Sequence, residues 1–175
     1  LLRESESRYR SLYEKTPEML HSIDGTGRLI SISDHWLATL GYARDEVLGR
    51  RSVEFLTEES RRYATEDVLP AFMRTGERKD VEYRFVKKNG EVIDTLLSAT
   101  SEHAAEGNMV RSLAVVTDIT SRKRSEEALK ESEEKFRLIF DNANDGILLI
   151  DKESMKFEIG NRKICEMLGY SKEEL

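Results

Sequence analysis

One short segment occurs twice in the sequence, and this repeat constrains the fold more than any other feature. Residues 2–24 return as residues 129–151 at a constant offset of 127 positions. The identical pairs are Leu2/Leu129, Glu4/Glu131, Ser5/Ser132, Glu6/Glu133, Arg10/Arg137, Ile23/Ile150 and Asp24/Asp151. Residues 40–42, Leu-Gly-Tyr, likewise return at residues 168–170, one position out of that register. Self-similarity at a fixed spacing indicates a tandem array of one structural unit, and we expect the second copy to be truncated at Leu175.

Composition limits the class of protein. The 175 residues are 38% hydrophobic and 35% charged, which suits a globular chain with one complete domain and part of another. No apolar run approaches the length of a membrane span, and no signal peptide is present at the start. The single cysteine, Cys165, excludes an internal disulfide and fits a reducing compartment. We therefore expect a cytoplasmic fragment of a longer parent protein, with no membrane segment in this part.

Charge and motif content exclude several function classes. The net charge of −6 and an isoelectric point near 5.3 argue against nucleic acid as a partner, because phosphate binding needs a concentrated basic face. The sequence contains no glycine-rich phosphate loop, nucleophile elbow or spaced carboxylate pair. A histidine-kinase phosphoacceptor box and a cyclase motif are also missing. Any catalysis is therefore expected in the parent protein and not in this chain.

Residues 1–16 predict an amphipathic helix. The helix should end before Pro17, because the residue that precedes proline disfavours helical backbone angles. Its apolar seam follows a three-four spacing. The seam residues are Leu2, Ser5, Tyr9 and Leu12. The repeat predicts a second helix of the same kind at residues 129–140.

Between these two helices, periodicity and turn residues predict two strands, several helices and three further strands. The expected ranges are strands 19–24 and 29–32, helices 34–40, 44–48 and 58–75, and strands 81–85, 92–100 and 109–117. Ser33 or Asp34 should cap the first of these helices, and Pro70 should kink the longest. Asn89-Gly90 is the strongest hairpin signal in the chain. This order of elements is typical of an α+β domain with an antiparallel sheet.

Five short motifs follow one another in a characteristic order. They are Ile23-Asp24 before a glycine turn, Leu40-Gly41-Tyr42, the run from Asp45 to Gly49, Lys88-Asn89-Gly90-Glu91, and Asp118-Ile119-Thr120. In this order and spacing, residues 19–120 resemble a PAS domain. The resemblance implies a five-stranded antiparallel sheet, helices across one face, and between them a cavity that holds a ligand or cofactor in many members. One departure is Ser33, where the family usually has asparagine and the second copy has Asn161; it concerns one hydrogen bond and not the fold.

The repeat and the resemblance together divide the chain into four parts. The expected parts are an amphipathic helix at residues 1–16, a complete PAS domain at 17–120, a linker helix at 121–140 and the truncated start of a second PAS domain at 141–175. In PAS proteins the segment after the Asp-Ile-Thr motif is typically a signalling helix. We therefore expect Asp118, Ile119 and Thr120 to transmit the signal out of the domain.

The linker helix at residues 121–140 contains no proline or glycine and continues the three-four spacing. Its seam positions are Arg122, Ser125, Leu129, Ser132, Phe136 and Ile139. Polar residues at the first two positions weaken a coiled coil, so two registers could have similar stability. We expect helices 1–16 and 121–140 to pair with their twins in a homodimer. The alternative is that the linker is only a solvated spacer helix.

The histidines and the cysteine restrict the cofactor. No histidine or cysteine has a neighbour at metal-ligand spacing, so no metal site is expected. Haem-binding relatives generally take their axial histidine from the long helix, and residues 58–75 contain none, which leaves His21 on the first strand as the alternative. The LOV photoreceptor relatives need a cysteine where this chain has Ser52. A serine hydroxyl is too weak a nucleophile, so a cysteinyl-flavin adduct is excluded.

The sequence is compatible with a small ligand that is bound without a covalent bond. The candidate pocket residues are Trp36, Phe55, Tyr63, Phe72 and His21. Trp36 could stack on a flavin ring, although a tryptophan on a short amphipathic helix more often belongs to the core. The sequence alone does not determine which strand side chains point inward.

The sequence therefore predicts a cytoplasmic sensory PAS module of a larger signal-transduction protein, with a sensor histidine kinase as the favoured parent. A diguanylate cyclase or a phosphodiesterase is the alternative parent. The competing function is a ligand-free PAS domain that serves for dimerisation and signal relay. The stimulus, the occupant of the pocket and the output domain are not specified by these residues.

Overall fold

The computed structural model describes residues 11–103, 109–171 and 174, which belong to two units, Leu1–Ser121 and Arg122–Leu175. Of the helix expected at residues 1–16, residues 11–14 are helical. The seam residues Leu2, Ser5 and Tyr9 lie outside the described residues.

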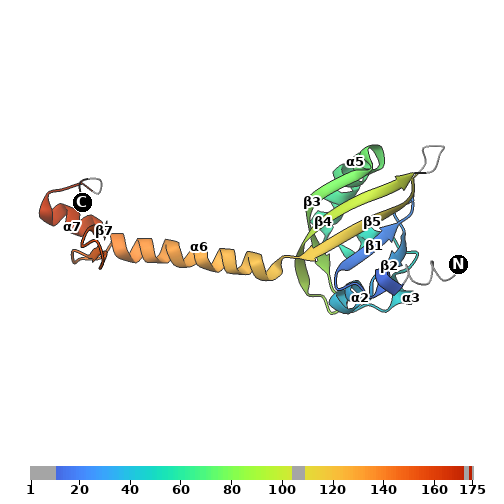
Figure 1. Ribbon diagram of the computed structural model, residues 1–175, viewed down its shortest axis with the longest axis horizontal. Coiled ribbons are helices and arrows are strands. Elements are labelled where there is room, and N and C mark those ends of the chain that lie inside the picture. Colours follow the sequence, from blue (N-terminus) through green and yellow to red (C-terminus); the bar gives the residue numbers. More distant parts are fainter. Residues whose placement is uncertain (1–10, 104–108, 172–173, 175) are drawn as a thin grey trace. The chain divides into compact units, whose positions relative to one another are not determined.

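Five antiparallel strands form one sheet in the first unit (Figure 1). The strands are β1 (Met19–Ile23), β2 (Leu29–Ile32), β3 (Glu77–Val86), β4 (Val92–His103) and β5 (Met109–Asp118). Their order across the sheet is β2-β1-β5-β4-β3, so β1, the first of the five strands in the sequence, pairs with β5, the last of them. The predicted α+β fold with a five-stranded antiparallel sheet is confirmed.

Short helices fill the connection between β2 and β3. They are α2 (Asp34–Leu40), α3 (Arg44–Val47), the 3₁₀-helix η1 (Ser52–Phe55), α4 (Glu58–Tyr63), the π-helix η2 (Ala64–Val68) and α5 (Leu69–Thr75). Ser33 caps α2 by accepting the Trp36 N–H, and Gly41 ends it at φ 77°, a conformation that glycine adopts without steric cost. Thr57 caps α4 in the same way.

The long helix expected at residues 58–75 contains a π-helical segment. Pro70 lies just inside α5 and has no N–H to donate to the preceding turn. The turn before it widens into η2, so the expected kink takes the form of a π-helical insertion. Sequence periodicity did not predict η2, because its buried residues, Ala64 and Val68, keep the four-residue spacing of an α-helix.

One face of the sheet carries the core. On β3, the buried residues Val81, Tyr83 and Phe85 alternate with exposed ones, as a strand with one covered face requires. Trp36 and Leu40 of α2 are buried in the same core cluster. The helices therefore cover the inner face, as predicted.

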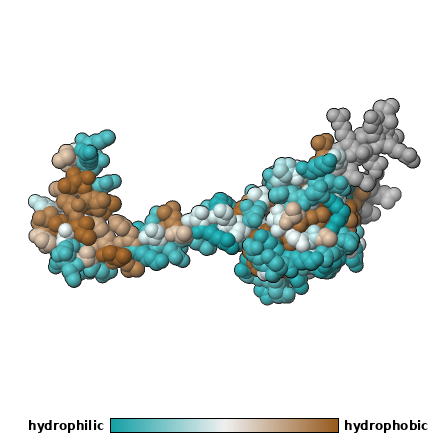
Figure 2. All heavy atoms as spheres, turned by 90° about the horizontal axis from the view of Figure 1, so that it is seen from below, coloured by the Kyte–Doolittle hydropathy of each residue, from teal (hydrophilic) through white to brown (hydrophobic). Residues whose placement is uncertain are grey.

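The second unit contains α6 (Thr120–Asp141), which starts in the first unit, followed by β6 (Leu148–Ile150), β7 (Phe157–Gly160) and α7 (Arg162–Leu168). β6 and β7 form a two-stranded antiparallel sheet. Many of the apolar side chains in this unit are exposed, as the hydrophobic surface in Figure 2 shows. On the paired strands these include Leu149, Ile150, Phe157 and Ile159.

Candidate functional site

A cavity of about 50 Å³ lies between the inner face of the sheet and the helices η1, η2 and α5. Four strands contribute to its wall, β1, β3, β4 and β5. Most of the lining side chains are apolar, and the polar ones are His21, Ser52, Arg78, Tyr83 and Ser112. A cavity of this kind favours a small and largely apolar occupant.

His21 projects from β1 toward the core. The strand register places it opposite Ile32 of β2 and Ala114 of β5, on the inner face of the sheet. The side chain is 5% exposed, and its Nδ1 has no hydrogen-bond partner among the described residues. Burial lowers the pKa of His21 to about 4, because the imidazolium would lose its hydration. The ring is therefore neutral at neutral pH.

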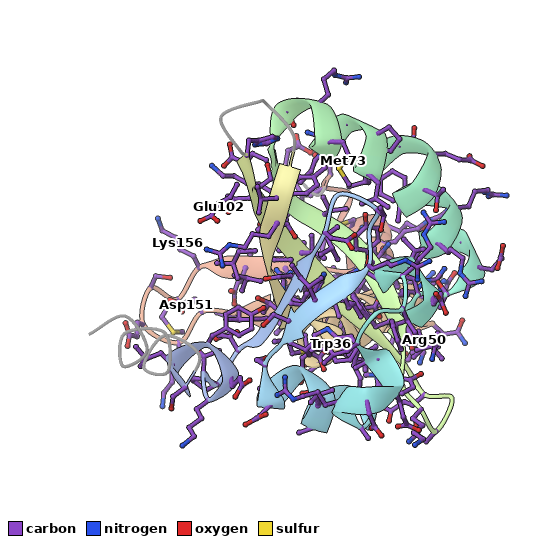
Figure 3. All side chains as sticks on the ribbon, turned by 90° about the vertical axis from the view of Figure 1, so that its right-hand side faces the viewer. Trp36, Arg50, Met73, Glu102, Asp151 and Lys156 are labelled. Atoms are coloured by element: carbon purple, nitrogen blue, oxygen red, sulfur yellow. The ribbon has the colours of Figure 1, made fainter. Side chains whose placement is uncertain are left out.

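The five candidate pocket residues occupy three different environments. His21 and Phe72 line the cavity. Trp36 and Phe55 pack against each other in the core, with ring centroids 5.5 Å apart. Tyr63 is 47% exposed and contacts the Tyr83 ring. Figure 3 shows Trp36 of α2 at the opposite end of the helical layer from Met73 of α5.

Two polar residues of the cavity wall, Arg78 and Tyr83, were not among the pocket candidates predicted from the sequence. Ser112 also lines the cavity, and the sequence of β5 alone does not determine that its side chain points inward. The signal that would have found it is the pairing of β5 with β1 and β4, because residues directly opposite in an antiparallel pair share a face. That pairing joins segments about ninety residues apart, and local periodicity does not predict it.

Neither haem nor flavin fits this cavity. One water needs about 10–15 Å³ on the same measure, so the cavity admits about three to five water-sized groups. Both cofactors are several times larger. Ser52, the residue at the place of the LOV cysteine, is part of the cavity wall.

The junction between β5 and α6 is a closed group of hydrogen bonds. The Ile119 N–H donates to the Asp94 carbonyl oxygen at 2.9 Å, and the Asp94 N–H donates to Thr120 Oγ1 at 2.9 Å. Asp118 Oδ1 accepts the Thr120 N–H at 2.9 Å, and the Ile119 side chain is buried. These bonds join the end of β5, the start of β4 and the first residue of α6. The three residues predicted to transmit the signal therefore all belong to this junction.

Three of the sequence motifs are in direct contact. Lys88 Nζ lies 2.6 Å from Glu46 Oε1, and the Lys88 N–H donates to the Leu40 carbonyl oxygen at 2.9 Å. The hydrogen bond from Lys88 lowers the pKa of Glu46. The Tyr42 hydroxyl donates to the Val86 carbonyl oxygen at 3.2 Å. The Leu-Gly-Tyr and Lys-Asn-Gly motifs thus hold the β3–β4 turn against α2 and α3.

Ser33 and Asn161 occupy equivalent positions in the two units. Each accepts two backbone N–H groups and donates to one backbone carbonyl. The partners of Ser33 are Leu20, Trp36 and Glu18, and those of Asn161 are Ile147, Ile164 and Asp145. Asn161 also donates to the Phe140 carbonyl oxygen at 2.9 Å, which a serine with one proton cannot do in addition. The departure at Ser33 therefore removes one hydrogen bond and keeps the cap.

Two kinds of feature are absent from the part of the chain that the structure describes. Within residues 11–103, 109–171 and 174, no three His, Cys, Asp or Glu side chains are grouped so that they could hold a metal ion. None of the described helices combines the length and the apolar character that crossing a membrane requires.

Comparison with known families identifies the fold. A PAS domain family model matches residues 17–121. The chain belongs to the PAS domain family. A second PAS domain model matches residues 134–175, so PAS character extends into the second unit.

The curated proteins similar to this PAS chain include two kinases. Sporulation kinase E of Bacillus subtilis is 26% identical over 171 residues, which cover 98% of this chain and 22% of that protein. The sensor histidine kinase TmoS of Ectopseudomonas mendocina is 24% identical over 145 residues, 81% of this chain and 15% of TmoS. An uncharacterised protein of Sinorhizobium fredii, y4lL, is 34% identical over 147 residues, 81% of this chain and 17% of y4lL. The chain thus spans less than a quarter of the length of each of these relatives.

Solved PAS structures share the fold. The PAS domain of an HTR-like protein from Haloarcula marismortui is 29% identical, with a TM-score of 0.56 over 67% of this chain and 94% of that one. The Rhodobacter sphaeroides LOV protein is 18% identical, with a TM-score of 0.60 over 73% of each chain. The second similarity concerns the fold alone.

Proposed function

We propose that this chain is the cytoplasmic sensory part of a larger sensor histidine kinase. In this proposal the first PAS domain passes a conformational signal through Asp118, Ile119 and Thr120 into α6. The observation that carries it is the junction between β5 and α6. Both β4 and β5 contribute side chains to the cavity wall, and the bonds that anchor Thr120 lie where β4 begins and β5 ends. A change in the cavity that moves β4 relative to β5 would therefore alter the start of α6.

Two observations support a longer parent protein. The similarity to sporulation kinase E covers nearly the whole chain and only 22% of that kinase. In the second unit, Leu149, Ile150, Phe157 and Ile159 are exposed by 41–49% on paired strands. In a complete PAS domain, further strands and helices would cover such residues.

Thr120→Val is expected to loosen the junction. The substitution keeps the side-chain shape but removes the oxygen that accepts the Asp94 N–H. A lost hydrogen bond of this kind costs about 1–2 kcal/mol, so amide exchange at Asp94 and in the first turn of α6 should accelerate about tenfold. Hydrogen exchange followed by mass spectrometry measures this. In the full-length parent, the same variant should uncouple autophosphorylation from the stimulus.

Thr117→Val is the matched control, because Thr117 lies on β5, three residues before Thr120, and its side chain is exposed. It should leave exchange at the junction unchanged. Equal amide exchange rates at the junction in the Thr120→Val variant and in the unmodified chain would contradict the proposed role of the junction.

The proposed partner of α6 is a second copy of the chain. Leu129, Phe136 and Ile139 are 61%, 55% and 73% exposed, and their spacing of seven and three residues places them along one helix face. The rest of α6 is mostly charged, with ion pairs such as Lys135 to Glu131 on the surface. A stripe of this kind is stabilised when an identical helix covers it.

Leu129→Glu is expected to weaken the homodimer at least tenfold. Each copy would place a charge where a leucine side chain, worth about 1.5–3 kcal/mol on burial, meets its twin. Lys130→Glu is the control: it adds more negative charge on the same turn but lies off the stripe. Sedimentation velocity over a range of concentrations gives the dissociation constants. If the unmodified chain stays monomeric at high concentration, or if both variants weaken the homodimer equally, the helices do not pair through this stripe.

A ligand-free relay module is the second candidate function. The small size of the cavity favours it, since no large cofactor fits in about 50 Å³. Absorbance spectra and mass spectrometry of a denatured extract, from protein expressed under several conditions, separate the two functions. A retained small molecule supports sensing by ligand, and clean extracts from all conditions support the relay.

A further inference from the structure

His21 Nδ1 is a buried polar atom that lacks a hydrogen-bond partner among the described residues. About nine in ten or more of the buried polar groups in folded proteins are paired, so an exception calls for a partner that the described residues do not supply. The His21 side chain is 5% exposed and lines the cavity. The cavity is the space from which such a partner can reach the ring.

The cavity wall selects against charged occupants. Of the residues that line it, none carries a carboxylate, so a bound cation would have no counter-charge. Arg78 is the charged member of the lining, and its Nη1 already donates to Thr75 Oγ1 at 3.2 Å and to the Glu77 carbonyl oxygen at 3.0 Å. The remaining wall is mainly alkyl and aromatic, with Val68 and Phe72 on the helical side. Transfer of an ion into such surroundings costs far more than transfer of a neutral group.

A hydroxyl group can pair with His21 in either neutral tautomer, because it both donates and accepts a hydrogen bond. An N–H donor or a carbonyl oxygen acceptor would form a hydrogen bond with Nδ1 in only one of the two tautomers. Ser112 supplies a second polar contact in the same wall. Its Oγ accepts the Ile23 N–H at 3.1 Å, which leaves the serine proton to donate.

We propose that this cavity binds a small uncharged alcohol, with its hydroxyl on His21 Nδ1 and a chain of three or four carbons against the helical wall. The proposal rests on the sensory function proposed above and specifies the class of ligand. The volume admits about three to five water-sized groups, which matches a molecule of this size. Such an occupant would contact β1, β5 and η2 together, and β5 leads to the junction at Asp118.

Titration of ¹⁵N-labelled protein with 1-propanol tests the proposal by NMR. We expect saturable shifts of the His21 ring nitrogen and of the Ser112 and Ala114 amides. The dissociation constant should be on the order of millimolar, because a ligand of so few atoms has limited binding energy. 1-Chloropropane, propionate and propylammonium should each bind at least tenfold more weakly. The first lacks the hydroxyl, and the other two carry charge.

His21→Leu should reduce the affinity for 1-propanol at least tenfold and leave the binding of 1-chloropropane nearly unchanged. His35→Leu is the matched control, since His35 is exposed on α2 and is not part of the cavity wall. Should the His21 variant fail to fold, the ring-nitrogen shift in the unmodified protein still shows whether the hydroxyl reaches Nδ1.

Three results would overturn the proposal. They are no saturable shift up to solvent-like alcohol concentrations, equal affinity for 1-propanol and 1-chloropropane, and shifts that cluster away from His21. Dimerisation through α6 and exchange at Thr120 are measured without ligand. A failed alcohol titration therefore leaves the proposed sensory function standing, and a failed junction test leaves the alcohol site standing.

Discussion

Trp36→Ala is expected to lower the free energy of unfolding of the first unit by about 3–5 kcal/mol, the usual loss for truncating a buried aromatic residue. Trp36 is 1% exposed. Its ring meets Phe55 and Phe85 edge-to-face at centroid distances of 5.5 and 6.4 Å. Alanine would leave a cavity that these rings cannot fill. Urea denaturation followed by far-UV circular dichroism gives the difference.

Trp36→Phe is the control that separates packing from polarity. Phenylalanine keeps a ring beside Phe55 and removes the indole Nε1, which has no partner among the described residues. The removed polar atom offsets part of the lost volume, so we expect a cost of about 1 kcal/mol. An alanine variant as stable as the phenylalanine variant would contradict the core position of Trp36. Trp36 is buried in the core and does not line the cavity, so no flavin can stack on its ring.

Acidification from pH 6.5 to pH 4 is expected to remove about 3 kcal/mol of stability through His21 alone. The pKa of His21 is about 4 in the folded protein, against an ordinary value of 6.5. Between these values the unfolded chain binds a proton that the folded chain does not bind. The contribution of neutral His21 to the free energy of unfolding is therefore fully present above pH 6.5 and is lost as the pH falls toward 4.

The measurement compares urea denaturation of the unmodified chain, called the parent protein in this comparison, with that of the His21→Leu variant at pH 7 and pH 4.5. The parent should lose about 2–3 kcal/mol more than the variant over this interval. Carboxylates with lowered pKa values, such as Glu46 and Glu54, also destabilise the fold in acid, but they do so equally in both proteins. His35→Leu, at an exposed position, should retain the parent profile. Parallel profiles for the parent and the His21 variant would show that His21 is not buried in a neutral state.

Local chemistry was sufficient to predict most of the elements. Ser33 and Gly41 delimit α2, and Asn89-Gly90 lies in the turn between β3 and β4, because capping and turn geometry depend on residues a few positions apart. The repeat also predicted that Asn161 and Ser33 hold equivalent places, which their shared pattern of hydrogen bonds confirms.

Other features depended on contacts that local patterns do not contain. β3 begins at Glu77, four residues before the predicted strand, and a bulge with Asp80 at φ 53° separates the two parts. The bulge interrupts the alternation from which the strand was predicted. Tyr63 shows the same limit on a helix: it contacts Tyr83 from an exposed position and not from a pocket.

The sequence by itself determined the order of strands and helices, the repeated unit and the junction motif at residues 118–120. The elements and the motif depend on residues close together in the chain, and the repeat is visible when the sequence is compared with itself. Only the tertiary structure decided that β1 lies between β2 and β5, that His21 and Ser112 face the same cavity, and that this cavity is too small for haem or flavin. The physical reason is that the direction of a strand side chain depends on its register with a distant strand. A cavity is the space left over when side chains from many elements pack together, so no single stretch of sequence specifies its volume.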